Sequence, residues 1–131
     1  KHVKKSEYNY GVVQTLERLK IYDWAFNVGF YAIYHCFLAI LAKYGYESRN
    51  QACTITVLLT LINEKKLNLD KDLVTQFDTL DVEKSIASPT VRERREISTY
   101  GVETSIDLQQ LKKVKELILK VQREAIRILG V

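Results

Sequence analysis

Proline and glycine are scarce in this sequence, which has one proline and five glycines among 131 residues. All-β folds depend on these residues for their many turns, so the scarcity argues against that class. The length fits one domain, and an apolar content of 47% is enough for a core and argues against general disorder. We therefore expect a single domain over residues 1–131, in which the lysine-rich residues 1–5 form a mobile tail.

Cysteine and histidine are equally scarce, with Cys36, Cys53, His2 and His35 as the only members. They form no C-x-x-C motif or Cys/His cluster, so the sequence predicts no metal site and no disulfide framework. It also has no glycine-rich phosphate loop, and we expect no cofactor. Both cysteines lie in apolar segments, and two buried thiols suit a reducing compartment, which predicts a cytoplasmic protein. A Ser/His/Asp or Cys/His catalyst would have to use His35, which has no supporting residues beside it in the sequence.

Apolar residues recur every three or four positions through most of the chain, which is the spacing of amphipathic helices. Cap signals accompany several segments: Asp23, Asp70 and Ser88–Pro89 suit helix starts, and Thr104 with Asp107 forms a capping box. The β-branched residues of 51–63 would allow a strand, but no second strand is available to pair with it. The expected fold is an all-α, single-domain bundle of five to six helices, over residues 6–20, 24–44, 51–63, 73–86, 88–101 and 104–129.

The segment from Trp24 to Tyr44 is aromatic and almost uncharged. Its first nineteen residues, to Ala42, would just span a bilayer. However, it contains Asn27 and His35 and is surrounded by amphipathic, charged helices, which favours the central helix of a bundle and no membrane. Because this helix is apolar on all sides, we also expect a second copy of the chain to cover one of its faces.

The segment from Ser88 to Gly101, SPTVRERREISTYG, is charged and has few apolar residues. Two interpretations remain open. It is either a solvated face with ion pairs between residues one turn apart, or an anion site in which Arg92, Arg95 and Thr99 share one helix face. The net charge of +4 is compatible with an anionic partner.

Two segments resemble the HEPN domains, a family of helical proteins. The stretch AFNVGFYAIYHCFLAILAKYGYES is similar to the family's signature helix, and RREISTYG resembles a later element in which arginine and four residues precede Tyr-Gly. The resemblance runs from about Asp23 to Leu129. The matching residues are Phe30, Tyr31, Ala32, His35, Ala39, Leu41, Gly45, Arg95, Tyr100 and Gly101.

The resemblance implies a homodimer with a four-helix core and an arginine-lined cleft for RNA or nucleotide phosphate, in a toxin–antitoxin or defence system. Many relatives are metal-independent endoribonucleases, which makes Arg95 and Tyr100 the candidate catalytic residues. Arg92, Arg95 and Thr99 would bind phosphate.

The sequence departs from the family motif because Tyr100 stands where active relatives have histidine, and no histidine follows His35. This leaves open an inert interaction module that pairs with a small nucleotidyltransferase. Asn27, Tyr31 and His35 are secondary site candidates. The alternative for Tyr31 is a core or dimer-interface aromatic, and for His35 a core histidine with hydrogen bonds inside the bundle.

Overall fold

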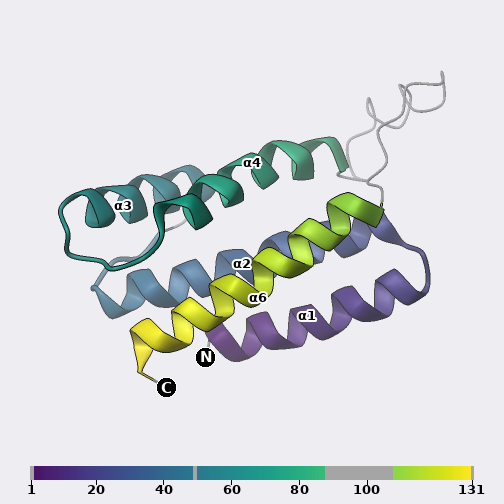
Figure 1. Cartoon of the computed structure of the whole chain (residues 1–131), viewed down its shortest axis with the longest axis horizontal. Helices are drawn as coiled ribbons and strands as arrows, with labels where there is room; N and C mark the ends of the chain where they lie inside the picture. The colour runs from purple at the N-terminus through teal and green to yellow at the C-terminus, as the bar shows by residue number, and fades with distance from the viewer. Residues whose placement is uncertain (1, 49, 88–107, 131) are drawn as a thin grey trace.

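The chain is an all-helical bundle in the computed structural model, which describes residues 2–48, 50–87 and 108–130 (Figure 1). These residues form five helices and no strand. The expected all-α fold is therefore confirmed for this part of the chain. The predicted helix over 88–101 and the predicted capping box of Thr104 and Asp107 lie outside it. The helices are α1 (His2–Arg18), α2 (Tyr22–Lys43), α3 (Gln51–Asn63), α4 (Lys71–Ala87) and α6 (Leu108–Leu129).

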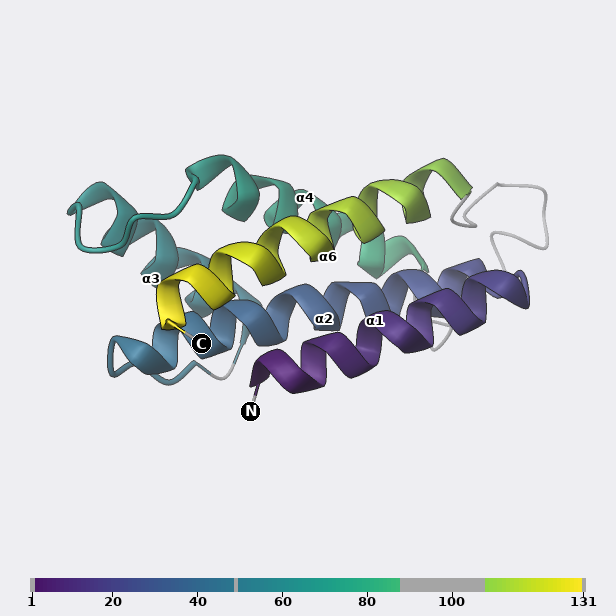
Figure 2. The same cartoon turned by 60° about the horizontal axis from the view of Figure 1, so that its bottom comes forward.

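Helix α2 is the centre of the bundle and contacts each of the other four helices. It lies beside α1, and α6 runs over this pair (Figures 1 and 2). Its phenylalanines Phe26, Phe30 and Phe37 are fully buried, and the ring of Phe30 stacks on Phe77 of α4 with centroids 4.7 Å apart. α2 is long and apolar enough to cross a membrane, but 67% of its apolar window is buried by the rest of the molecule, as in a bundle's central helix.

The helix ends agree with the sequence in some places and differ in others. Gly45 follows α2 with φ 85° and donates its N–H to the carbonyl of Ala42 at 3.1 Å, as expected for a glycine after a helix. Asp70 accepts the N–H of Asp72 at 3.0 Å at the start of α4, also as expected. The prediction that Asp23 caps α2 is wrong, because the cap position is Ile21. Helix α1 starts at His2, four residues before the predicted start.

A buried polar group joins α1, α2 and α6. The hydroxyl of Ser6, which is fully buried, accepts a hydrogen bond from the Cys36 thiol at 3.2 Å and another from Gln122 Nε2 at 2.9 Å. Burial raises the pKa of Cys36 to about 11, so its thiol stays protonated at neutral pH and can act as a donor. The expectation of two buried thiols holds for Cys36 and is wrong for Cys53, which is exposed in the first turn of α3.

The C-terminal half of α6 is held to the bundle by its own side chains and by those of its neighbours. Lys43 at the end of α2 donates to the carbonyl of Ile128, and Arg127 donates to the carbonyl of Asn68 at 2.6 Å. Farther up the helix, Lys115 forms an ion pair with Glu17 of α1 at 2.5 Å. These contacts fix α6 against both α1 and α2, and α4 lies along its other side.

Candidate functional site

The arginine-rich residues that the sequence singles out, Arg92, Arg95, Thr99 and Tyr100, lie outside the described residues. The helices on either side of them are described. α4 ends at Ala87 and α6 begins at Leu108, and these two ends lie at the same end of the bundle (Figure 1). The candidate catalytic and phosphate-binding residues fall between these two helices in the sequence.

The three secondary candidates lie on α2 at intervals of four residues, an arrangement that places them on one helix face. The structure separates Asn27 from the other two, because its side chain is buried and its Nδ2 donates to the Asp23 carbonyl at 3.2 Å. Asn27 thus stabilises the first turns of α2. Tyr31 is 40% exposed, and Trp24, two turns earlier on the same face, is 48% exposed. Trp24 and Tyr31 together form an exposed surface, which we call the α2 aromatic face.

Tyr31 of the α2 aromatic face packs against neighbouring aromatic rings. The ring of Tyr31 meets Phe30 edge to face at 5.5 Å and Tyr34 at 6.4 Å. Tyr34 stacks on the buried ring of Phe77, with centroids 6.2 Å apart. Edge-to-face and stacked pairs of this kind favour a single ring orientation. The ring of Tyr31 is therefore packed against other aromatic rings on one side and exposed on the other.

The side chain of His35, on α2, contacts the start of α1. Its ring stacks on His2 with centroids 5.7 Å apart, and its Nδ1 is buried with no hydrogen-bond partner among residues 2–48, 50–87 and 108–130. Burial lowers the pKa of His35, and the positive charges of Lys5 and His2 lower it further. The imidazole is therefore neutral at neutral pH. Its Nδ1 is buried, so a substrate in solvent could not reach this nitrogen. The expectation of a hydrogen-bonded core histidine is wrong for this nitrogen.

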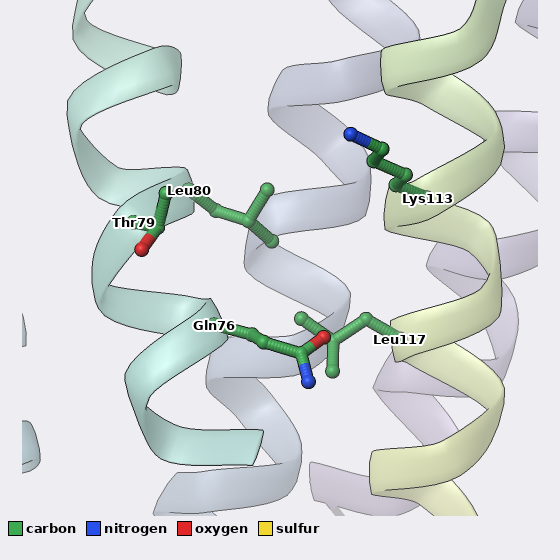
Figure 3. Close-up of a pocket in the computed structure, with 5 residues that line it drawn as sticks. All are labelled: Gln76, Thr79, Leu80, Lys113 and Leu117. Carbon is green, nitrogen blue, oxygen red and sulfur yellow. The ribbon is translucent and has the colours of Figure 1, made fainter. Parts of the chain in front are cut away.

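A groove lies between α4 and α6, and it is made of two adjoining hollows that share Gln76. The first has a volume of about 180 Å³ and lies between buried leucines and a polar rim (Figure 3); its lining is Gln76, Thr79, Leu80, Lys113 and Leu117. The second has a volume of about 410 Å³ and is lined by Asp70, Asp72, Leu73, Gln76, Lys120, Arg123 and Glu124. We call the two together the α4–α6 groove.

The charged side chains of the α4–α6 groove differ in how they are engaged. Each carboxylate has a partner: Asp70 caps α4, Asp72 accepts from Gln76 Nε2 at 3.0 Å, and Glu124 accepts from Arg127 at 2.8 Å. The cations Lys113, Lys120 and Arg123, all on α6, make no hydrogen bond or ion pair with the part of the chain that the structure describes. The lining therefore holds three cations, all on α6, and three carboxylates, so its formal charges balance.

Two of these features were missed in the sequence, and each has a structural reason. His2 was assigned to a tail because lysines surround it, yet its ring packs on His35. Gln76 and Arg123 were not singled out because their proximity depends on how α4 and α6 pair. The described residues contain no group of three or more His, Cys, Asp or Glu side chains that could hold a metal ion.

Comparison of the chain with protein-family models and with curated proteins finds no match.

Proposed function

We propose that the chain is a HEPN-like helical protein that acts as a homodimer in a cytoplasmic toxin–antitoxin or defence system. It would bind RNA or nucleotide phosphate through Arg92 and Arg95, with Thr99 as a further hydrogen-bond donor. The resemblance of the two sequence segments supports this proposal. The all-helical arrangement with the aromatic helix at its centre agrees with it.

The α2 aromatic face is the observation that carries the proposal. Four helices surround α2, and still Trp24 and Tyr31 expose 48% and 40% of their surfaces. Large aromatic side chains are enriched at interfaces between proteins and depleted from free surfaces. A second copy related by a two-fold axis would place the same face against itself and cover both residues.

Light scattering after size-exclusion chromatography tests the dimer. We expect the wild-type protein to have the mass of a dimer, and the Trp24→Glu and Tyr31→Glu variants that of a monomer. Tyr8→Glu is the matched control, because Tyr8 is 72% exposed on α1 and lies outside the α2 aromatic face. A monomeric wild type, or a dimer that survives both substitutions, would contradict this part of the proposal.

RNA binding is tested by fluorescence anisotropy with a labelled single-stranded RNA of mixed sequence. Affinity should fall steeply as salt rises, because phosphate contacts release counterions, and it should be lost when Arg92 and Arg95 are both replaced by alanine. Arg18→Ala is the control for a general loss of positive charge, because Arg18 is an exposed residue of α1. Unchanged binding by the double variant would exclude these arginines as the phosphate contact.

Ribonuclease activity would require a base for the ribose 2′-OH and a cation for the phosphate. Arg95 would supply the charge, but Tyr100, with an ordinary pKa of about 10, is a poor base at neutral pH. Cleavage of an RNA pool in EDTA, with Arg95→Ala as control, decides whether the wild type is active. If the missing histidine is the only defect, Tyr100→His should increase cleavage.

The absence of histidine after His35 favours a second candidate function. In this alternative the same dimer is catalytically inert and holds a small nucleotidyltransferase. Co-expression with the product of the neighbouring reading frame, followed by co-purification, tests it. A neighbouring frame that encodes no nucleotidyltransferase, or a nucleotidyltransferase that does not bind, would argue against this alternative.

A further inference from the structure

We propose that two copies of the chain join through an antiparallel pair of α2 helices, in which Trp24 of each copy packs opposite the partner's Ala42. The inference rests on the homodimer of the proposed function and adds its geometry: the helix face that is used, the direction of the two helices and the residues that meet. Three features of α2 carry it, namely the spacing of its uncovered residues, the sizes of their side chains and the charges at its two ends.

Helix α2 has a continuous stripe of residues that the other described helices leave uncovered or only half-covered. The stripe, which we call the α2 seam, consists of Trp24, Val28, Tyr31, His35, Leu38 and Ala42. The intervals between these residues alternate between four and three, which places them on one helix face and is typical of helices that pack in pairs. The seam covers about 27 Å of the helix axis. It contains no charged residue.

The spacing of the α2 seam is the same when it is read in either direction. Intervals of four, three, four, three and four residues lead from Trp24 to Ala42. A second α2 that runs the opposite way therefore places its seam residues at the same levels as those of the first. A two-fold axis that crosses the seam between Tyr31 and His35 generates this pair. The levels then match Trp24 with the partner's Ala42, Val28 with the partner's Leu38, and Tyr31 with the partner's His35.

The sizes of the side chains favour the antiparallel direction over the parallel one. In the antiparallel pair the largest seam residue, Trp24, lies opposite the smallest, the partner's Ala42, at both ends. The total volume is then similar at every level, so the two helices can pack closely along the whole seam. In a parallel pair two tryptophans would meet at one end and two alanines at the other. The helices could not then be in close contact at both ends.

The charges of α2 favour the same direction. Asp23 and Lys43 are the only charged residues of the helix, and they lie just beyond the two ends of the seam. An antiparallel pair places the Asp23 end of each helix beside the Lys43 end of its partner, whereas a parallel pair places like charges beside each other. The antiparallel pair also brings the positive N-terminus of each helix beside the negative C-terminus of the other.

The two polar side chains at the middle of the seam fix its register. In the antiparallel pair His35 lies at the level of the partner's Tyr31, whose hydroxyl can donate or accept a hydrogen bond. A polar residue within an apolar seam specifies register, because other alignments bury it against apolar groups. A slip of one heptad in either direction would separate these two residues and shorten the contact by about 10 Å.

Cross-linking of single cysteines tests the direction of the helices. One preparation carries Val28→Cys and another Leu38→Cys, both with Cys53→Ser, because Cys53 is exposed and the buried Cys36 should not react. In an antiparallel pair position 28 lies opposite the partner's position 38, while the two copies of either position lie about 15 Å apart along the axis. With a short bismaleimide, we expect neither preparation to cross-link alone. The two should cross-link to each other after they are mixed in urea and refolded together.

Tyr8→Cys in the same background is the matched control, because Tyr8 is exposed on α1 and lies outside the α2 seam. It should not cross-link to Val28→Cys. Cross-linking of each seam preparation alone would indicate a parallel pair, and a dimer without any cross-link would indicate another face. Either result would overturn the inference and leave the homodimer standing. A monomeric wild type in light scattering would remove the homodimer, and this inference with it.

The sizes of the end residues give a second test, measured by sedimentation equilibrium. Ala42→Trp would place tryptophans opposite each other at both ends of an antiparallel pair, so the dissociation constant of the dimer should rise at least about tenfold. Ala42 is exposed, so the added ring should leave the fold of the monomer intact. The Trp24→Ala/Ala42→Trp variant again has one tryptophan at each end and should regain most of the affinity. Equal or tighter association of Ala42→Trp alone would overturn the inference.

Discussion

Gly29 of α2 has no room for a side chain beside Val114 of α6, because a Cβ at position 29 would lie 2.6 Å from Val114 Cγ1. The same atom would lie 3.4 Å from Ile118 and 3.7 Å from Val13 of α1. Three helices therefore meet at this glycine. Glycine inside a helix costs about 0.5–1 kcal/mol relative to alanine, and here the close approach of α6 offsets that cost.

Gly29→Ala should consequently destabilise the protein, even though alanine is the better helix former. Overpacking of a dense core costs about 1–3 kcal/mol, and we expect a loss of that size in the free energy of unfolding, measured with urea. Gly11→Ala is the control, because Gly11 lies in α1 with no atom within 4 Å of an added Cβ, and there the same change should stabilise. Equal stabilities of the two variants would show that α6 does not need the glycine.

The Ser6 hydroxyl offers a second prediction. Ser6→Ala leaves the buried Gln122 amide without its acceptor, and an unsatisfied buried polar group costs about 1–3 kcal/mol. Replacement of Gln122 by leucine in the same variant should recover part of this loss, since no donor is then left unpaired. Urea unfolding of both single variants and the double variant gives the coupling energy. Strictly additive losses would mean that the two groups do not interact.

The stability of the protein should decrease as the pH falls below about 6.5, the ordinary pKa of histidine. The pKa of His35 is lowered in the fold by burial, by Lys5 and by His2, so the unfolded chain binds a proton there first. Stability therefore rises with pH across the window between the lowered pKa and 6.5.

NMR titration of the His35 ring measures this pKa directly. His2→Ala and Lys5→Ala should each move it upward, toward the ordinary value, because each removes a neighbouring positive charge. His35→Phe keeps a ring against His2 and should flatten the pH dependence of the urea midpoint. A His35 pKa of 6.5 or higher in the wild type would refute the prediction.

The two cysteines should react at very different rates in the folded protein. Cys53 is exposed, whereas Cys36 is fully buried and burial raises its pKa to about 11. The thiolate is the reactive form, so a reagent such as DTNB at neutral pH should modify Cys53 quickly and Cys36 only after unfolding. The Cys53→Ser variant should show no fast reaction in its native state. Rapid modification of Cys36 in that variant would show that α1 opens readily from α2.

The sequence predicts the helices better than it predicts their ends. The uncharged run from Trp24 to Tyr44 identifies α2 and its burial, because a helix that is apolar on all sides has to be covered. The prediction that Asp23 caps α2 is wrong because the helix starts earlier, at Tyr22, whose ring packs against the core. Residues 2–5 look like a tail because the local pattern is charged, and the stacking of His2 on His35 is a contact between helices that no local pattern contains.

The same limit applies to the candidate site. Helical periodicity puts Asn27, Tyr31 and His35 on one face of α2, but it cannot tell that Asn27 is covered and Tyr31 exposed, since burial depends on the neighbouring helices. The spacing of Lys113, Lys120 and Arg127 in the sequence predicts that they share one polar face of α6. The structure divides them, because Arg127 pairs with Glu124 and Asn68 while the two lysines line the groove with α4.

The position of α6 in the sequence has a consequence for biosynthesis. Ser6 and Gln122 are 116 residues apart, and Lys43 and Ile128 are 85 apart, so the bundle closes only after α6 has left the ribosome. At about 5–20 residues per second, the emerging chain exposes the unpaired side of α2 for on the order of ten seconds. During that interval Gly29 and the phenylalanines beside it form an exposed apolar surface. The release of α6 from the ribosome therefore sets the time at which this surface of α2 can be covered.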